Sequence, residues 1–179
     1  MSAPLLVVVT GPPASGKSTI ARELAEELHI PFLSKDELKE RLYEEIGSGD
    51  ELEDAIERSA TAILYSVARS NLKVGVSVLV ESNFDSASDT APLRELDARI
   101  VQVHCGGETD ALVRHFAERS ASGERHPGHD DDPEDAGELR RKIESGLWDP
   151  LDLPGELIRV DASQGHVDVK SIAARSVFG

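Results

Sequence analysis

The sequence predicts an α/β fold, with a parallel β-sheet covered by helices on both faces. Two observations support this prediction. Short aliphatic runs such as Leu5–Val9 alternate with longer segments whose apolar residues recur every three or four positions. These short runs also lack polar alternation, which is typical of strands buried on both sides and joined by right-handed crossovers.

The aliphatic runs predict five strands, at 5–9, 31–33, 74–80, 100–105 and 157–160. Parallel strands present their carboxyl ends at one edge of the sheet, and ligands of such sheets bind at that edge. We therefore expect functional residues directly after the strands, at 11 onward, 34–36, 81–83, 106 and 161.

Helical periodicity predicts the elements between the strands. In the first helix, Ile20, Leu24 and Leu28 are four residues apart and form one face. Ser34 is a suitable N-cap for the second helix, and Glu37 occupies the capping-box position. Helices are expected at 18–28, from 34 to the glycines at 47–49, at 50–71, from 89 or 90, and at 109–120, 138–145 and 169–178.

The composition indicates one globular domain over residues 1–179, with 39% hydrophobic and 30% charged residues. The 19 Lys and Arg residues against 34 Asp and Glu give a net charge of −15. This charge disfavours long nucleic acids and anionic membranes as partners. The single cysteine, Cys105, excludes an internal disulfide and fits a reducing compartment.

Targeting signals are also absent from the sequence. No apolar run approaches the roughly 18 residues of a membrane span, and the N-terminus lacks a basic region and a signal-peptide core. We therefore expect a cytoplasmic protein that begins at its native N-terminus. No heptad seam or large apolar stripe indicates an interface, so a monomer and a homodimer both stay open.

The residues after the first strand form a phosphate-binding motif. Gly11 to Ser18 match G-x-x-x-x-G-K-[S/T] between a predicted strand and an amphipathic helix. The glycines let backbone N–H groups approach phosphates, and the helix N-terminus adds partial positive charge. Lys17 reaches the β- and γ-phosphates, and Ser18 ligates Mg²⁺. The predicted nucleotide-binding residues of this loop are Gly11, Pro12, Pro13, Ala14, Ser15, Gly16, Lys17, Ser18 and Thr19.

The motif identifies a ligand but not a reaction. A GTPase needs a guanine-specific N-K-x-D motif, which is absent, and the D-x-x-G at Asp152–Gly155 contains a proline and follows no predicted strand. No L-S-G-G-Q run is present, and the chain is short for a motor. Three further features favour phosphoryl transfer to a small acceptor.

The first two features follow the second and third predicted strands. Asp36 faces the expected γ-phosphate and can accept or orient a hydroxyl proton; otherwise it is an ordinary acid of a first helical turn. Glu81 ends the third strand, where a Walker B acid holds the Mg²⁺ shell, so it can serve the metal or the acceptor. Asn83 can donate to the acceptor. Ordinary capping of the strand end is the alternative for both.

The third feature is the basic set Arg114, Arg119 and Arg125. We expect residues 114–137 to form a lid, and the part from 122 onward to be a mobile surface segment. Arg119 and Arg125 are favoured over Arg114 to neutralise the transferred phosphoryl group. A solvated helix face with ion pairs is the alternative. His126 and His129 are expected to contact the acceptor, and a metal site that adds Asp130 is the weaker interpretation.

These motifs together resemble the small AAA-type P-loop kinases, which are related to polynucleotide kinase, chloramphenicol phosphotransferase and the zeta-toxin kinases. The resemblance covers most of the chain. It implies a nucleoside-monophosphate-kinase-like core with three layers, the sheet order 2-3-1-4-5 and an arginine-bearing lid. It also implies that Asp36 is the catalytic carboxylate and that Asp161 and Ser163 lie beside the adenine. Glu81 departs from the usual aspartate, which leaves its metal role open.

We therefore expect an ATP-dependent kinase that uses Mg²⁺ and phosphorylates a hydroxyl of a small molecule. Lys17, Asp36, Arg119 and Arg125 are the expected catalytic residues. A kinase of a nucleotide sugar or a nucleic-acid 5′ end is an alternative enzyme. A non-catalytic nucleotide-binding switch is the alternative without chemistry, and it would tolerate loss of Asp36.

Overall fold

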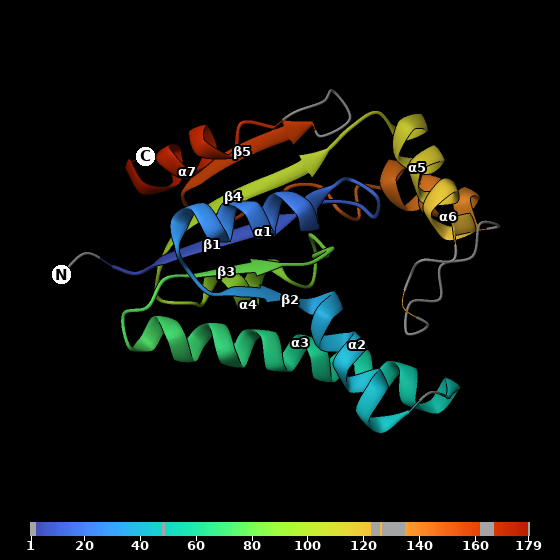
Figure 1. The fold of residues 1–179 in the computed structure, drawn as a ribbon, viewed down its shortest axis with the longest axis horizontal. Coiled ribbons are helices and arrows are strands. Elements are labelled where there is room, and N and C mark those ends of the chain that lie inside the picture. The colour runs from blue at the N-terminus through green and yellow to red at the C-terminus, as the bar shows by residue number, and fades with distance from the viewer. Residues whose placement is uncertain (1–2, 48, 123–125, 127–134, 162–166, 179) are drawn as a thin grey trace.

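A five-stranded parallel sheet organises the chain, with the strand order β2-β3-β1-β4-β5. The computed structural model describes residues 3–47, 49–122, 126, 135–161 and 167–178. The strands are β1 (Leu5–Thr10), β2 (Phe32–Ser34), β3 (Val78–Glu81), β4 (Arg99–Gly106) and β5 (Glu156–Asp161). The predicted fold class and strand order are confirmed, and all carboxyl ends lie at one edge (Figure 1).

Helices cover both faces of the sheet and extend beyond its carboxyl edge (Figure 1). Helices α1 and α7 lie on one face, and α3 and α4 on the other. Helix α2 packs on α3, and α5 packs on α6 beside the strand ends. The helices are α1 (Lys17–Leu28), α2 (Lys35–Ile46), α3 (Asp50–Lys73), α4 (Thr90–Arg94), α5 (Thr109–Ser122), α6 (Ala136–Glu144) and α7 (Val169–Phe178).

The central strand β1 is apolar throughout because it faces two separate cores. Val7 and Val9 pack in the core that contains Leu24 of α1. Leu6 and Val8 pack in the core that contains Leu64 of α3. All of these side chains are fully buried. Side chains of a strand alternate between its faces, so a strand buried on both sides shows no polar alternation.

The predicted start of the third strand, at residue 74, is wrong, because β3 begins at Val78. Helix α3 continues to Lys73, and Gly75 follows with a φ of 81°. The Val76 N–H donates to the Asn71 carbonyl (3.0 Å), and its side chain is exposed. This closing turn of α3 uses the apolar residues at 74 and 76, so β3 begins only at Val78. In the part of the chain described here, no helix has the length and apolar character needed to cross a membrane.

Gly155 is required where the chain enters β5. Its φ is 105°, and a Cβ there would lie 2.1 Å from the Ile100 carbonyl oxygen of β4. Gly47 has a similar φ of 96° with no atom within 4 Å of the added Cβ. We expect Gly155→Ala to lower the free energy of unfolding by about 3 kcal/mol or more, and Gly47→Ala by only about 1 kcal/mol. Urea denaturation measures both, and equal losses would contradict the close approach of β4.

The thiol of Cys105 is buried in the core beside β4. Its side chain has no exposed surface, and burial raises its pKa to about 12. At pH 8 only about one thiol in ten thousand would then be ionised, against about a quarter for a free cysteine. We expect a thiol reagent at pH 8 to leave the native protein unmodified and to label one cysteine after denaturation. Rapid labelling of the native protein would contradict this packing.

Candidate active site

The chain leaves β1 in a loop whose backbone shape depends on its small residues. Gly11, Ala14 and Gly16 have φ values of 147°, 62° and 75°. A Cβ on Gly11 would lie 1.9 Å from the Cys105 carbonyl oxygen, so only glycine fits against β4. Gly16 caps α1 without a side-chain hydrogen bond. The first turn of α1 therefore presents its backbone N–H groups to an external anion, as a phosphate-binding loop requires.

Lys17 is folded back into this loop. Its side chain is buried, and its ammonium group donates to the Pro12 carbonyl (3.3 Å). Burial lowers the pKa of Lys17, while the negative charges of Glu81 and Asp36 oppose that shift. An incoming phosphate would add negative charge beside the lysine and favour its ammonium form.

Glu81 is the buried acid at the centre of the strand ends. It lies beside Val9 of β1 and Ser34 of β2 in the sheet register, and its exposed fraction is 1%. One carboxylate oxygen accepts from the Ser18 hydroxyl (3.2 Å), and the other accepts from the Ser34 hydroxyl (2.8 Å). Burial raises the pKa of Glu81, against the opposing effects of Lys17 and both hydroxyls.

Ser18 and Glu81 fit a magnesium site. Both offer hard oxygen ligands, and their hydrogen bond shows that the two side chains reach the same point. Within the described residues, no group of three or more His, Cys, Asp or Glu side chains could hold a metal. Magnesium is commonly bound by one or two protein groups together with nucleotide phosphates, so a complete protein cage is not required.

Ser34 links the buried acid to the start of α2. Its hydroxyl accepts from the Glu37 N–H (3.5 Å), which confirms the predicted N-cap. The Glu37 carboxylate pairs instead with Arg22 of α1 (2.7 Å) and does not complete the capping box. The cap fixes the first turn of α2, which carries Asp36. Asp36 interacts electrostatically with both Lys17 and Arg119.

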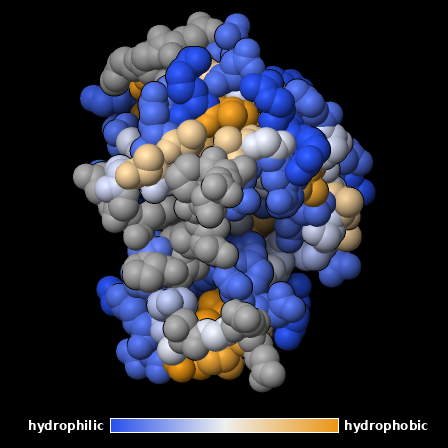
Figure 2. All heavy atoms as spheres, turned by 90° about the vertical axis from the view of Figure 1, so that its right-hand side faces the viewer, coloured by the Kyte–Doolittle hydropathy of each residue, from blue (hydrophilic) through white to orange (hydrophobic). Residues whose placement is uncertain are grey.

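A cavity of about 540 Å³ lies over this cluster. Figure 2 shows the same edge of the molecule, where hydrophilic side chains predominate. Arg119 reaches the cavity from α5, whereas Arg114 is exposed and does not line it. Burial lowers the pKa of Arg119, opposed by Asp36. The lining residues are Pro13, Lys17, Ser18, Arg22, Ser34, Lys35, Asp36, Glu37, Lys39, Glu40, Glu53, Glu57, Ser82, Asn83 and Arg119.

Several of these lining residues were not predicted from the sequence. Lys39 and Arg22 were not singled out, and neither were Glu53 and Glu57 of α3. The spacing of Lys35 and Lys39, four residues apart at the start of α2, was a usable signal because it places both on one helix face. The contribution of α3 had no comparable signal, since it depends on how α2 packs on α3.

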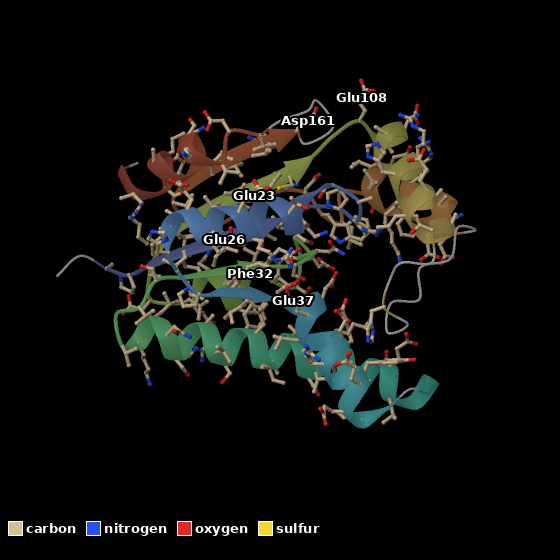
Figure 3. All side chains as sticks on the ribbon, in the orientation of Figure 1. Glu23, Glu26, Phe32, Glu37, Glu108 and Asp161 are labelled. Atoms are coloured by element: carbon tan, nitrogen blue, oxygen red, sulfur yellow. The ribbon has the colours of Figure 1, made fainter. Side chains whose placement is uncertain are left out.

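A second cavity, of about 550 Å³, lies at the ends of β4 and β5. Asp161 lines it and pairs in register with Gly106 of β4. An adjoining smaller cavity shares His104 and Gly106 with it and reaches Pro12 of the phosphate loop. Figure 3 shows Asp161 at the end of β5, on the other side of the sheet edge from Glu37. The predicted adenine neighbour Asp161 therefore borders a cavity that continues toward the phosphate loop.

Three predicted site residues, Arg125, His129 and Ser163, lie outside the described residues. His126 is described, and it contacts α2. Its ring meets Tyr43 edge to face at 5.5 Å between centroids, and its Nε2 lies 3.6 Å from a Glu44 carboxylate oxygen. The structure thus joins one residue of the segment between α5 and α6 to the C-terminal half of α2.

Comparison with known proteins identifies the family. The AAA domain family AAA_33 matches residues 6–136. The crystal structure of a "putative kinase" from Chloroflexus aurantiacus is 34% identical, with a TM-score of 0.85, over 97% of this chain and 96% of that one. A sugar kinase from Janibacter sp. HTCC2649 shares the fold, with 17% identity and a TM-score of 0.63 over 97% of this chain and 92% of that one.

A curated relative matches only a short segment. The cytidylate kinase of Ignicoccus hospitalis is 52% identical over 42 residues, which is 24% of this chain and 24% of that protein. The family match and the whole-chain match to the Chloroflexus protein are the broader findings. They show that this chain belongs to the AAA domain family and is a P-loop kinase of the AAA type.

Proposed function

We propose that this protein transfers the γ-phosphate of ATP to a hydroxyl group of a small molecule. One observation carries the proposal: a single cavity contains the phosphate-loop residues Lys17 and Ser18 together with Asp36 and Arg119. A protein that only bound nucleotide would need the first pair and not the second. The sugar kinase with the same fold is consistent with a hydroxyl acceptor.

The nucleotide half of the site holds and polarises the triphosphate. Backbone N–H groups of the non-proline residues from Gly11 to Thr19 and the ammonium group of Lys17 bind its phosphates. Ser18 and Glu81 would hold Mg²⁺, which supplies positive charge against the developing charge on the phosphate oxygens. Asp161 and Ser163 border the adenine in this assignment. Because Glu81 is already held by Ser18 and Ser34, its carboxylate needs little rearrangement to act.

In the half of the site that binds the acceptor molecule, Asp36 takes up a proton and Arg119 supplies positive charge. The acceptor oxygen attacks the γ-phosphorus, the bond from that phosphorus to the β–γ bridging oxygen breaks, and the hydroxyl proton passes to the Asp36 carboxylate. Arg119 interacts electrostatically with Asp36 and neutralises negative charge on the transferred phosphoryl group. We assign Arg125 the same role. Asn83, His126 and His129 are proposed to contact the acceptor molecule.

Replacing Asp36 tests the assignment most directly. Asp36→Asn keeps the size of the side chain but removes its ability to take the proton. We expect ATP affinity to stay within about threefold and phosphoryl transfer to fall by about 10²–10⁴-fold. Binding titrations and product formation measure the two effects. The control is Asp97→Asn, an exposed residue on the loop before β4. Unchanged transfer by Asp36→Asn would remove Asp36 from the mechanism.

Replacing Lys17 tests the nucleotide half separately. Lys17→Ala removes the ammonium group beside the phosphates, so we expect weaker ATP binding and slower transfer together, each by about tenfold or more. Isothermal titration with ATP and Mg²⁺ gives the affinity. Lys73→Ala, at the exposed end of α3, is the matched control and should change neither quantity. A Lys17→Ala protein with unchanged ATP affinity would contradict the placement of the phosphates.

A further inference from the structure

The acceptor side of the cavity that contains Lys17 and Asp36 is built almost entirely from polar side chains. Among the described residues that line it, Pro13 alone is apolar and none is aromatic. Sites for nucleobases and aromatic drugs depend on apolar and aromatic surface for most of their contact. The lining therefore favours an acceptor that is hydrophilic over most of its surface.

Lys35 and Lys39 share one carboxylate partner in this cavity. They are one helical turn apart on α2, and both contact the carboxylate of Glu57 on α3, with Lys39 Nζ 3.5 Å from one oxygen. Neither lysine has another ion-pair partner among the described residues. One carboxylate thus serves two ammonium groups, and these three side chains together carry one net positive charge.

The exposure of the three side chains shows which of them can be displaced. Lys35 and Lys39 are 19% and 17% exposed, whereas Glu57 is 43% exposed. A half-exposed carboxylate is readily rehydrated when it turns toward solvent, and ion pairs at such sites contribute little to stability. The ammonium groups have less access to water, so an anion that replaces Glu57 would form charge-assisted hydrogen bonds with both.

Nearby charges limit how much negative charge the ligand can carry. Arg22 and Glu37 also line the cavity but neutralise one another in an ion pair (2.7 Å). Glu40 and Glu53 line it too, so the lining holds five basic and five acidic side chains, and a strongly anionic ligand is disfavoured. A carboxylate, with one negative charge, suits this balance better than a phosphate monoester, which carries nearly two.

We propose that the acceptor is a polyhydroxylated carboxylic acid whose carboxylate is bound by Lys35 and Lys39 in place of Glu57. The inference rests on the proposed kinase function and names the substrate class of that site. Lys35 directly precedes Asp36 in the first turn of α2. Anchoring the carboxylate at Lys35 and Lys39 therefore keeps the rest of the acceptor close to Asp36, where a hydroxyl group is needed.

Matched acceptors test the proposal with the intact protein, ATP and Mg²⁺. The probes are straight-chain polyols of three to six carbons, each as the acid, the neutral alcohol and the phosphate ester, for example D-gluconate, D-glucitol and D-glucitol 6-phosphate. CMP is the nucleotide comparison. We expect at least one acid to exceed its neutral and phosphorylated counterparts by about tenfold or more in kcat/KM. Preference for the neutral alcohols, the phosphate esters or CMP, or no preference, would overturn the proposal.

Two variants separate recognition from a merely structural role. Lys39→Gln should raise KM for the preferred acid by about tenfold and leave KM for the neutral alcohol unchanged. Glu57→Gln should lower KM for the acid by about threefold, because it removes the competing carboxylate. A structural role predicts that both variants worsen KM for every acceptor, and that result would also overturn the proposal. Lys142→Gln, which breaks the Lys142–Glu138 pair outside the cavity, is the control.

The proposed kinase function can fail independently of this inference. ATP binding without transfer to any probe removes the hydroxyl-kinase assignment. In that event, isothermal titration of the same acids and alcohols into the protein with Mg²⁺ and ADP still decides the lysine site. Tighter binding of an acid, lost in Lys39→Gln, supports it, and equal or absent binding of acid and alcohol overturns it.

Discussion

The two hydrogen bonds to the Glu81 carboxylate join the phosphate loop, the end of β3 and the start of α2. Ser18 brings the phosphate loop to one oxygen, and Ser34 brings the start of α2 to the other. A buried carboxylate is unfavourable unless it is paired and hydrogen-bonded, so these partners are needed for Glu81 to remain in its place. The same bonds hold the phosphate loop close to the first turn of α2.

The sheet makes this arrangement possible by aligning three strand ends. Glu81 lies beside Val9 and Ser34 in the register of β1, β3 and β2. The phosphate loop follows β1, and Asp36 follows β2, so each begins at the same edge (Figure 1). Apolar packing on both faces of β1 holds the register. At the carboxyl edge, Ser18, Ser34 and Glu81 form one hydrogen-bonded cluster.

The fold and the centre of the site could be predicted because both leave local patterns in the sequence. Gly11 to Ser18 form one continuous motif, Glu81 ends β3, and Asp36 lies two residues after the end of β2. Lys39 and Glu57 could not be identified in this way, because their contact depends on the packing of α2 against α3. The start of β3 was misplaced since Val74 and Val76 suit a strand locally, while the continuing α3 helix takes them into its closing turn.

In the proposed reaction the γ-phosphate passes to an organic hydroxyl and not to water. Phosphorus NMR of the protein with ATP, Mg²⁺ and a panel of hydroxylated acceptors follows that phosphate directly. We expect a new phosphate-ester signal with one acceptor class and slow loss of ATP without an acceptor. Release of inorganic phosphate at a rate that no acceptor changes, or ATP that binds and stays intact throughout, would contradict it.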